Sequence, residues 1–178
     1  PGSMAAGISE KYAGALYVGY HAPAGSDGSP LAHTMDKNEI QWVRINGKLA
    51  SEFTLNSMYA AQMGVPSIFI SGDEAVCRLA KEEIPQIGTV AVKECRGNST
   101  FNIHPEEALE RIRAGVAAAL EREVPVREVP SELVLEVSLL RHQTLRAALA
   151  HPGIQQVGES VVRYTAHSPR ELNVVLGY

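Results

Sequence analysis

The sequence of 178 residues lacks the features that mark membrane and secreted proteins. No apolar run approaches the ~20 residues that are needed to cross a bilayer. The first residues contain no charged segment followed by an apolar one, as a secretory signal would. We therefore expect no membrane partner.

Cysteine and positive charge are also scarce. Only Cys77 and Cys95 occur, without a framework pattern, so we expect free thiols in a reducing, cytoplasmic setting rather than a disulfide. Lys and Arg total 16 against 20 Asp and Glu, which gives a formal net charge of −4. Because phosphate binding needs a clustered basic face and the basic residues here are scattered, we expect no nucleic-acid partner.

What is present is typical of a soluble globular protein, with 45% hydrophobic and 20% charged residues. Continuous apolar runs at 15–20 and 67–71 predict strands that are buried on both faces of a parallel sheet. A third strand is expected at 89–93, with helices at 52–63 and 73–83. The predicted fold class is α/β, a mostly parallel sheet flanked by helices with a small α+β lobe at the carboxyl end.

Two regions are predicted along the chain. A long helix begins at His104, and after a linker at 124–130 the order is strand, helix, strand, helix. We expect residues 5–123 to form the α/β core that carries the site and residues 131–178 to form the small lobe. Because the central sheet has few strands, we also expect another chain to complete it.

The segment between the first two buried strands contains a hairpin and a helix start. Residues 40–45 alternate apolar with polar side chains, as a half-buried strand does, and Asn46-Gly47 predicts a type I′ turn. Ser51 is a good N-cap for the helix that follows. A single buried stripe is predicted for that helix, formed by Leu55, Met58, Tyr59 and Gln62 or Met63.

Three residues carry side chains that metal sites and acid–base catalysis use. His21 follows the first strand, His33 follows a loop rich in Gly, Pro and Ser, and Glu52 opens a helix. Imidazole and carboxylate are zinc ligands, and neutral imidazole is a general base. Each also has an ordinary explanation: a backbone-bonded strand-end histidine, a surface histidine, and an acid favoured by the helix dipole. Since zinc takes four ligands, or three and water, the rest of such a site must lie elsewhere.

Other polar residues have simpler explanations. Asp73 and His104 are expected to be helix N-caps. Lys93, at a strand end, could form an ordinary ion pair or could reach into a site and orient a carbonyl or carboxylate group.

Four motifs in fixed order carry a resemblance that extends over residues 12–178. They are Gly19-Tyr20-His21-Ala22, Ala32-His33-Thr34-Met35, Ser51-Glu52-Phe53-Thr54-Leu55-Asn56 and Ile70-Ser71-Gly72-Asp73. Each motif is weak alone, but their order and spacing resemble the DppA-type D-aminopeptidases, zinc-dependent peptidases that remove amino-terminal D-residues from short peptides.

The resemblance implies a role for each candidate residue. His21 and Glu52 would bind one or two zinc ions, and His33 would act as acid or base beside a metal-activated water. Asn56 would orient the ligands or the substrate, a short peptide or small amide. Since family members form rings, a homo- or hetero-oligomer is also implied.

One family motif is absent from the sequence. The family has an Asp-x-Glu-Gly segment whose Asp bridges two metals, so this sequence resembles only the carboxyl-terminal two-thirds of a family member. A separate amino-terminal polypeptide could supply that segment, the chain could be shortened, or the activity could be lost. We expect a subunit of a zinc-dependent aminopeptidase or amidohydrolase completed by such a polypeptide; the alternative is a non-catalytic scaffold without metals.

Overall fold

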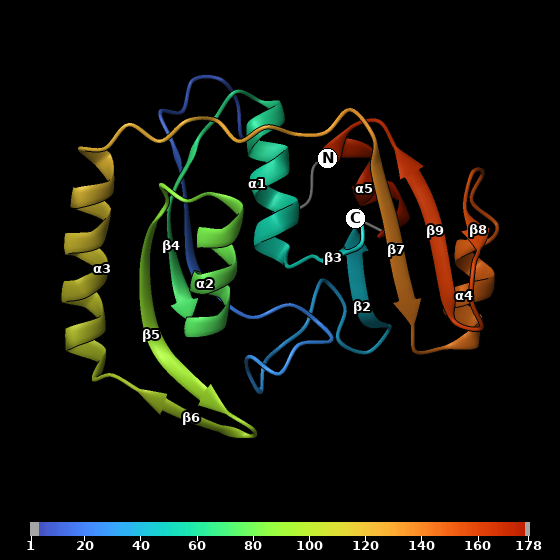
Figure 1. Ribbon diagram of the computed structural model, residues 1–178, viewed down its shortest axis with the longest axis horizontal. Helices are drawn as coiled ribbons and strands as arrows, with labels where there is room; N and C mark the ends of the chain where they lie inside the picture. The colour runs from blue at the N-terminus through green and yellow to red at the C-terminus, as the bar shows by residue number, and fades with distance from the viewer. Residues whose placement is uncertain (1–3, 177–178) are drawn as a thin grey trace.

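The computed structural model describes residues 4–176 and contains two sheets (Figure 1). The first sheet has the order β1-β4-β5-β6. Its first three strands are parallel, and β6 is antiparallel to β5, which confirms the predicted mostly parallel sheet. The strands are β1 (Ala15–Tyr20), β4 (Ser67–Asp73), β5 (Gly88–Arg96) and β6 (Ser99–Asn102).

Three helices flank the first sheet, as the sequence predicts. They are α1 (Glu52–Gln62), α2 (Glu74–Glu83) and α3 (Pro105–Leu120). Figure 1 shows α3 on the outer side of the sheet and α1 and α2 on the side that faces the second sheet. Because helices cover both faces, β4 is buried along its whole length, as a central parallel strand should be.

The second sheet is antiparallel, with the order β3-β2-β7-β9-β8. Asn46 and Gly47 connect β2 and β3 with φ angles of 49° and 80°, which confirms the predicted type I′ turn. The elements are β2 (Ile40–Ile45), β3 (Lys48–Leu49), β7 (Leu133–Leu139), α4 (His142–Ala148), β8 (Gln155–Gln156), β9 (Val161–Ala166) and α5 (Pro169–Val175).

The two sheets divide the chain differently from the predicted regions. Strands β2 and β3 belong to the segment 5–123 but pair with β7 in the second sheet. Strand pairing alone does not define domains, so the division into residues 5–123 and 131–178 stays a prediction. Residues 177–178 lie outside the described part. No helix within residues 4–176 is both long and apolar enough for a membrane crossing.

Helix α1 lies between the two hydrophobic cores. Phe53 packs in the core of the first sheet, whereas Leu55 and Met58 pack in the core of the second. The prediction of a single buried stripe was wrong: Tyr59 is half-buried and Gln62 exposed, and all residues from Phe53 to Met58 are buried, so burial extends around most of the helix. A helix between two cores has apolar or small residues on several sides, whereas the single-stripe pattern describes a helix with one face in solvent.

The two cysteines are free and lie in different environments. Burial raises the pKa of the Cys77 thiol to about 11, whereas Cys95 on β5 is partly exposed. At about pH 8 only about one Cys77 in a thousand would be thiolate, the reactive form. We expect iodoacetamide to modify Cys95 first and Cys77 only on unfolding or at strongly alkaline pH, as followed by mass spectrometry. Equal rates of modification of Cys77 and Cys95 in the folded protein would contradict the expected difference. In a Cys95→Ser variant, Cys77 is the remaining thiol, so its slow modification can be measured alone.

Candidate metal centre

The carboxyl end of β1 positions His21. The strand ends at Tyr20, opposite Gly72 of β4, where a Cβ atom would lie 2.0 Å from the Tyr20 carbonyl oxygen. Only glycine permits this approach, so the two strand ends stay together. His21 thus leaves the sheet at the edge where parallel α/β folds commonly place their sites.

The first turn of α1 positions Glu52. The Ser51 hydroxyl accepts a hydrogen bond from the Thr54 backbone N–H (3.1 Å), and Thr54 Oγ1 accepts one from the Ser51 N–H (3.1 Å). This reciprocal cap confirms Ser51 as the N-cap. Glu52 therefore opens the helix, as predicted.

The three candidate side chains converge on one point, here named the His–Glu cluster (His21, His33 and Glu52). The two imidazole rings stack with centroids 4.0 Å apart and planes inclined by 18°. Glu52 Oε2 lies 3.6 Å from His21 Nε2, and Oε1 lies 3.5 Å from His33 Nε2. One possible ligand atom from each residue lies within 4.8 Å of the other two. Residues that are distant in sequence thus meet in one partly buried group.

Hydrogen bonds on the far side of each ring determine which atoms face the carboxylate. His21 Nδ1 lies 3.1 Å from the Ala22 carbonyl oxygen, and His33 Nδ1 lies 2.7 Å from that of Leu31. Because a carbonyl oxygen only accepts, Nδ1 donates in both rings and carries the proton of the neutral form. In the neutral rings, both Nε2 atoms are therefore unprotonated and lie 3.5–3.6 Å from the Glu52 carboxylate.

This arrangement suits a bound cation. The Nε2–O separations of 3.5 and 3.6 Å exceed the usual N–H···O range of about 2.7–3.2 Å. Atoms that share a tetrahedral zinc, each about 2.0–2.1 Å from the metal, lie about 3.3 Å apart. Two imidazole nitrogens and a carboxylate are zinc-ligand types, and one such atom from each residue lies within 4.8 Å of the other two, so the residues of the His–Glu cluster fit zinc. Across residues 4–176, no fourth His, Cys, Asp or Glu joins the group.

The loop that carries His33 is anchored by the two residues that follow it. The Met35 N–H donates to Glu52 Oε1 (3.0 Å), and the buried Thr34 hydroxyl donates to the Ala50 carbonyl oxygen (2.9 Å). Met35 has a φ angle of 66°, in the left-handed region that non-glycine residues rarely adopt. Strained backbone of this kind is commonly found at functional sites. Neither contact has a local sequence signal, because each joins residues that are far apart in the chain.

Asp73 connects the His21 strand end to α2. Its carboxylate accepts from the Val76 N–H and from the Ala22 N–H, each at 2.8 Å. The first bond confirms the predicted N-cap, and the second fixes the residue that follows His21. The second bond spans 51 positions, so a short-range motif could not predict it.

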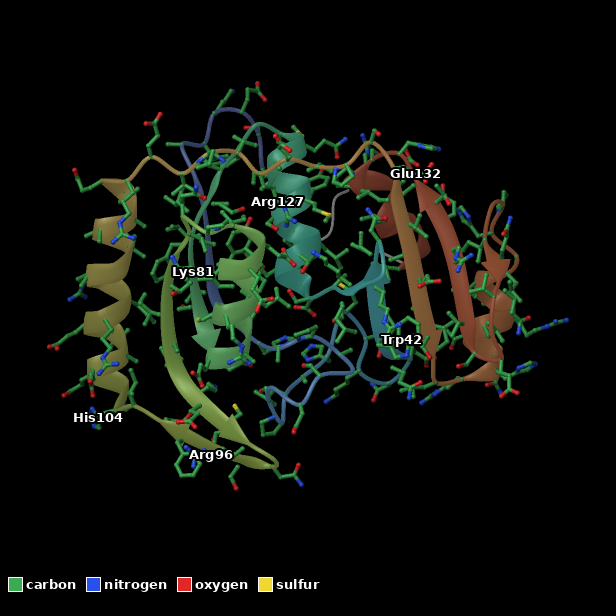
Figure 2. All side chains as sticks on the ribbon, in the orientation of Figure 1. Trp42, Lys81, Arg96, His104, Arg127 and Glu132 are labelled. Carbon is green, nitrogen blue, oxygen red and sulfur yellow. The ribbon has the colours of Figure 1, made fainter. Side chains whose placement is uncertain are left out.

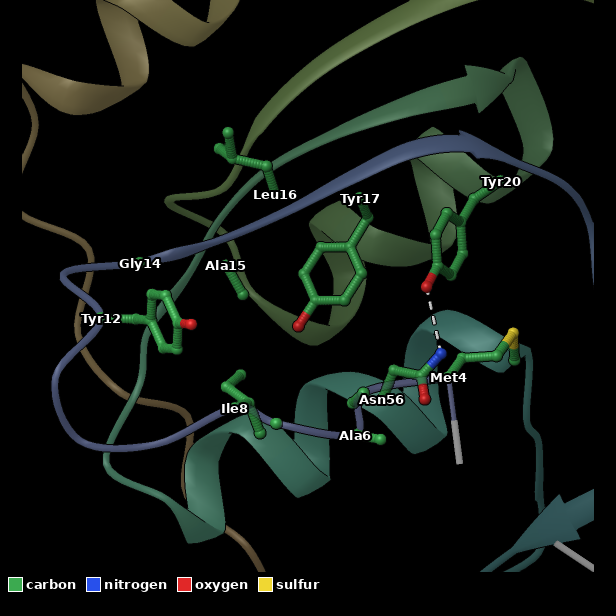
Figure 3. Close-up of a pocket in the computed structure, with 12 residues that line it drawn as sticks. Met4, Ala6, Ile8, Tyr12, Gly14, Ala15, Leu16, Tyr17, Tyr20 and Asn56 are labelled. Atoms are coloured by element: carbon green, nitrogen blue, oxygen red, sulfur yellow. Dashed lines mark hydrogen bonds between the residues drawn. The ribbon is translucent and has the colours of Figure 1, made fainter. Parts of the chain in front are cut away.

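Asn56 lies one helical turn beyond Glu52 and is buried. Its side-chain amide donates to Tyr20 Oη (3.0 Å). Burial raises the pKa of the Tyr20 phenol, the Asn56 hydrogen bond opposes this, and the charge of Glu52 adds to it. Both side chains line a cavity of about 330 Å³, together with Tyr17 and residues 4–8 (Figure 3). Asn56 thus lies beside the His–Glu cluster but belongs to an adjacent cavity.

Lys93 lies apart from the other candidates. It lines a hollow of about 390 Å³ at the end of β5, with Glu74, Glu94 and Phe101 among its neighbours. Within the described residues no hydrogen bond or ion pair links Lys93 to the His–Glu cluster.

Comparison with known proteins identifies the family. The family model of the M55 peptidases, described as D-aminopeptidase, matches residues 1–177. The chain belongs to the D-aminopeptidase family. Over 170 residues it is 29% identical to a D-aminopeptidase of Bacillus subtilis (strain 168), a match that covers 93% of this chain and 61% of the relative.

A solved structure has the same fold. This structure, described as the Zn-dependent D-aminopeptidase DppA from Bacillus subtilis, a self-compartmentalizing protease, superposes with a TM-score of 0.88 at 26% identity. The match covers 98% of this chain and 64% of the solved chain. The chain therefore spans less than two-thirds of the length of both relatives.

Proposed function

We propose that this chain forms part of a zinc-dependent aminopeptidase or amidohydrolase that acts on short peptides or small amides. His21 and Glu52 hold the zinc, and His33 is the acid or base. The approach of the His21 imidazole to the Glu52 carboxylate, with Nε2 3.6 Å from Oε2, carries the proposal, because both groups are zinc-ligand types and His33 Nε2 lies 3.5 Å from the same carboxylate, close enough to act beside a bound metal. Family membership and the zinc dependence of the Bacillus subtilis relative support it.

Each residue of the cluster has a distinct task. Zinc, when bound, supplies Lewis acidity that polarises an amide carbonyl and activates water near neutral pH. The side chain of His33 is 30% exposed, against 17% for His21 and 12% for Glu52, so substrate and water reach it most readily. With Nδ1 hydrogen-bonded to Leu31, its Nε2 takes a proton from the attacking water and returns it to the leaving amine.

The adjacent cavity is proposed to receive part of the substrate. Its volume of about 330 Å³ is within the usual range for small-molecule pockets. The Tyr20 hydroxyl and the Asn56 amide are among the polar groups of its lining and would orient a peptide bond. Lys93 would meet only a substrate that extends to the end of β5.

The remaining metal ligands are proposed to come from a separate amino-terminal polypeptide that carries Asp-x-Glu-Gly. Both relatives are longer than the matched region, and β1 lies at the edge of its sheet, where a further strand can pair. Since the Bacillus subtilis relative is self-compartmentalizing, we also propose that copies of this chain assemble into an oligomer.

Zinc content tests the proposal. We expect about one or two zinc ions per complex when the chain is purified with the complementary polypeptide. His21→Ala and Glu52→Ala should lose the zinc, whereas His33→Ala should keep it and lose activity. His151→Ala is the matched control, because this half-buried histidine packs against Tyr164 of the second sheet and has no place in the His–Glu cluster.

The same measurement separates the alternatives. Zinc loss in His33→Ala would make His33 a third ligand rather than the acid or base. If the unmodified chain binds no zinc, alone or with the polypeptide, the non-catalytic scaffold is the correct function. That scaffold is consistent with the absence of a fourth ligand in residues 4–176.

A further inference from the structure

A buried chain of hydrogen bonds reaches the first turn of α1 from the side opposite the metal centre. Glu52 and Thr54 are two positions apart, so their side chains point about 200° apart around the helix. Glu52 faces the two histidines, while the Thr54 hydroxyl donates to Glu83 Oε1 of α2 at 2.6 Å. Thr54 thus connects the ligand-bearing turn to a second helix.

The direction of these hydrogen bonds is fixed. An ionised carboxylate only accepts, so the single proton of the Thr54 hydroxyl goes to Glu83. The Thr54 oxygen then accepts from the Ser51 N–H (3.1 Å), and the Ser51 hydroxyl lies 3.2 Å from the same oxygen. The cap that defines the start of α1 is therefore completed by a charged group outside the helix.

Arg127 holds that charge in place. Its Nη1 donates to Glu83 Oε2 (2.9 Å), to Ser57 Oγ (2.5 Å) and to the Thr54 carbonyl oxygen (3.5 Å). Arg127 lies on the segment that crosses from α3 to β7 and passes beside α1 (Figures 1 and 2). Three separate parts of the chain thus meet behind Glu52.

The pair is largely buried, which makes stability alone a weak explanation for it. The side chains of Arg127 and Glu83 are 11% and 18% exposed, and Arg127 Nε is buried without a hydrogen-bond partner among residues 4–176. Burying such a pair costs desolvation energy that the attraction only partly offsets, and an apolar pair often does as well. The two residues instead fix the rotation of α1 about its own axis, because Arg127 donates hydrogen bonds to both Thr54 and Ser57 of that helix.

We propose that Glu83 and Arg127 are positioning residues for the metal centre, acting through Thr54 on the Glu52 carboxylate. In the described part of the chain the Glu52 carboxylate accepts one hydrogen bond, from the Met35 N–H, so the direction of its side chain depends on the helix start. Metal ligands must be held within about 0.5 Å of the productive geometry. This inference rests on the proposed zinc function and names the residues that pre-organise the ligand.

The experiment compares zinc affinity with fold stability in matched variants. Thr54→Val removes the hydroxyl at nearly constant volume, Thr54→Ser restores it, and Glu83→Gln keeps an acceptor for Thr54 but loses the charge. Glu136→Gln is the control, since Glu136 pairs with Arg163 at 2.7 Å on the second sheet, away from α1. The zinc dissociation constant is measured by competition with a chelator, and the melting temperature is measured without metal.

Thr54→Val should weaken zinc binding about tenfold, the usual cost of losing a group that orients a metal ligand. Glu83→Gln should weaken it less, Thr54→Ser should restore it, and Glu136→Gln should leave it unchanged while lowering the melting temperature. Unchanged zinc affinity in Thr54→Val and Glu83→Gln, with lowered melting temperatures, would overturn the inference and leave a structural role. Absence of zinc binding in the unmodified chain, both alone and with the complementary polypeptide, would instead refute the proposed function.

Discussion

Replacing Glu52 by glutamine is expected to weaken zinc binding by at least about 100-fold. Loss of a residue that only orients a metal ligand already weakens metal binding by up to about 100-fold, and loss of a ligand should cost at least as much. The amide keeps an oxygen that can accept from the Met35 N–H, so the loop stays anchored. It removes the negative charge that lies beside both Nε2 atoms and places an N–H₂ donor there instead. The metal-free variant should therefore unfold at an equal or higher temperature, because the amide can donate to a histidine.

Opposite changes in zinc affinity and metal-free stability distinguish a metal ligand from a structural acid. Calorimetric zinc titration and thermal unfolding with a chelator measure the two quantities. Glu106→Gln is the matched control, because Glu106 also lies in a first helical turn, 4.0 Å from His104, but is exposed. A metal-free Glu52→Gln protein less stable than the parent would mean that Glu52 serves as a structural ion-pair partner of the histidines.

Local chemistry predicted much of this site from the sequence. Ser51, Asp73 and His104 each have a side chain that can cap a helix, and each does so. Asn46-Gly47 forms the expected turn because few other residue pairs adopt two positive φ angles at low cost. These features depend on neighbouring residues, which the sequence displays directly.

The features that the sequence did not reveal depend on contacts between distant segments. The alternation in 40–45 indicates a half-buried strand but contains no information about which sheet it joins, and the structure pairs it with β7. The exposed strand β6 has no alternating pattern and was missed. Likewise the left-handed Met35 is specified by its bond to Glu52 and not by its residue type.

The meeting of His21, His33 and Glu52 was suggested by order and spacing, and the physical cause of the meeting became clear only in three dimensions. The β1 end, the anchored loop and the capped helix each contribute one side chain of the His–Glu cluster. Glu83 and Arg127 could not be connected to the site from sequence, because their effect passes through Thr54.

Asp73→Asn is expected to lower the free energy of unfolding by about 2–4 kcal/mol. A buried N–H that loses its acceptor costs about 1–3 kcal/mol, and here the amide N–H₂ would also face that N–H, donor against donor. Asp73 is fully buried and accepts from both Ala22 and Val76, whereas the amide can satisfy only one of them. Urea unfolding of the metal-free protein measures the loss.

The control for Asp73→Asn is an ordinary cap. His104→Ala removes the N-cap of α3, which is exposed and makes one capping bond, and should cost only about 1 kcal/mol. The difference between the stability losses of Asp73→Asn and His104→Ala then measures the contribution of the hydrogen bond to Ala22, the residue after His21. Since that bond fixes the strand end, zinc affinity should also fall about tenfold. A stability loss no larger than that of His104→Ala, with zinc binding intact, would show that Asp73 is a helix cap and nothing more.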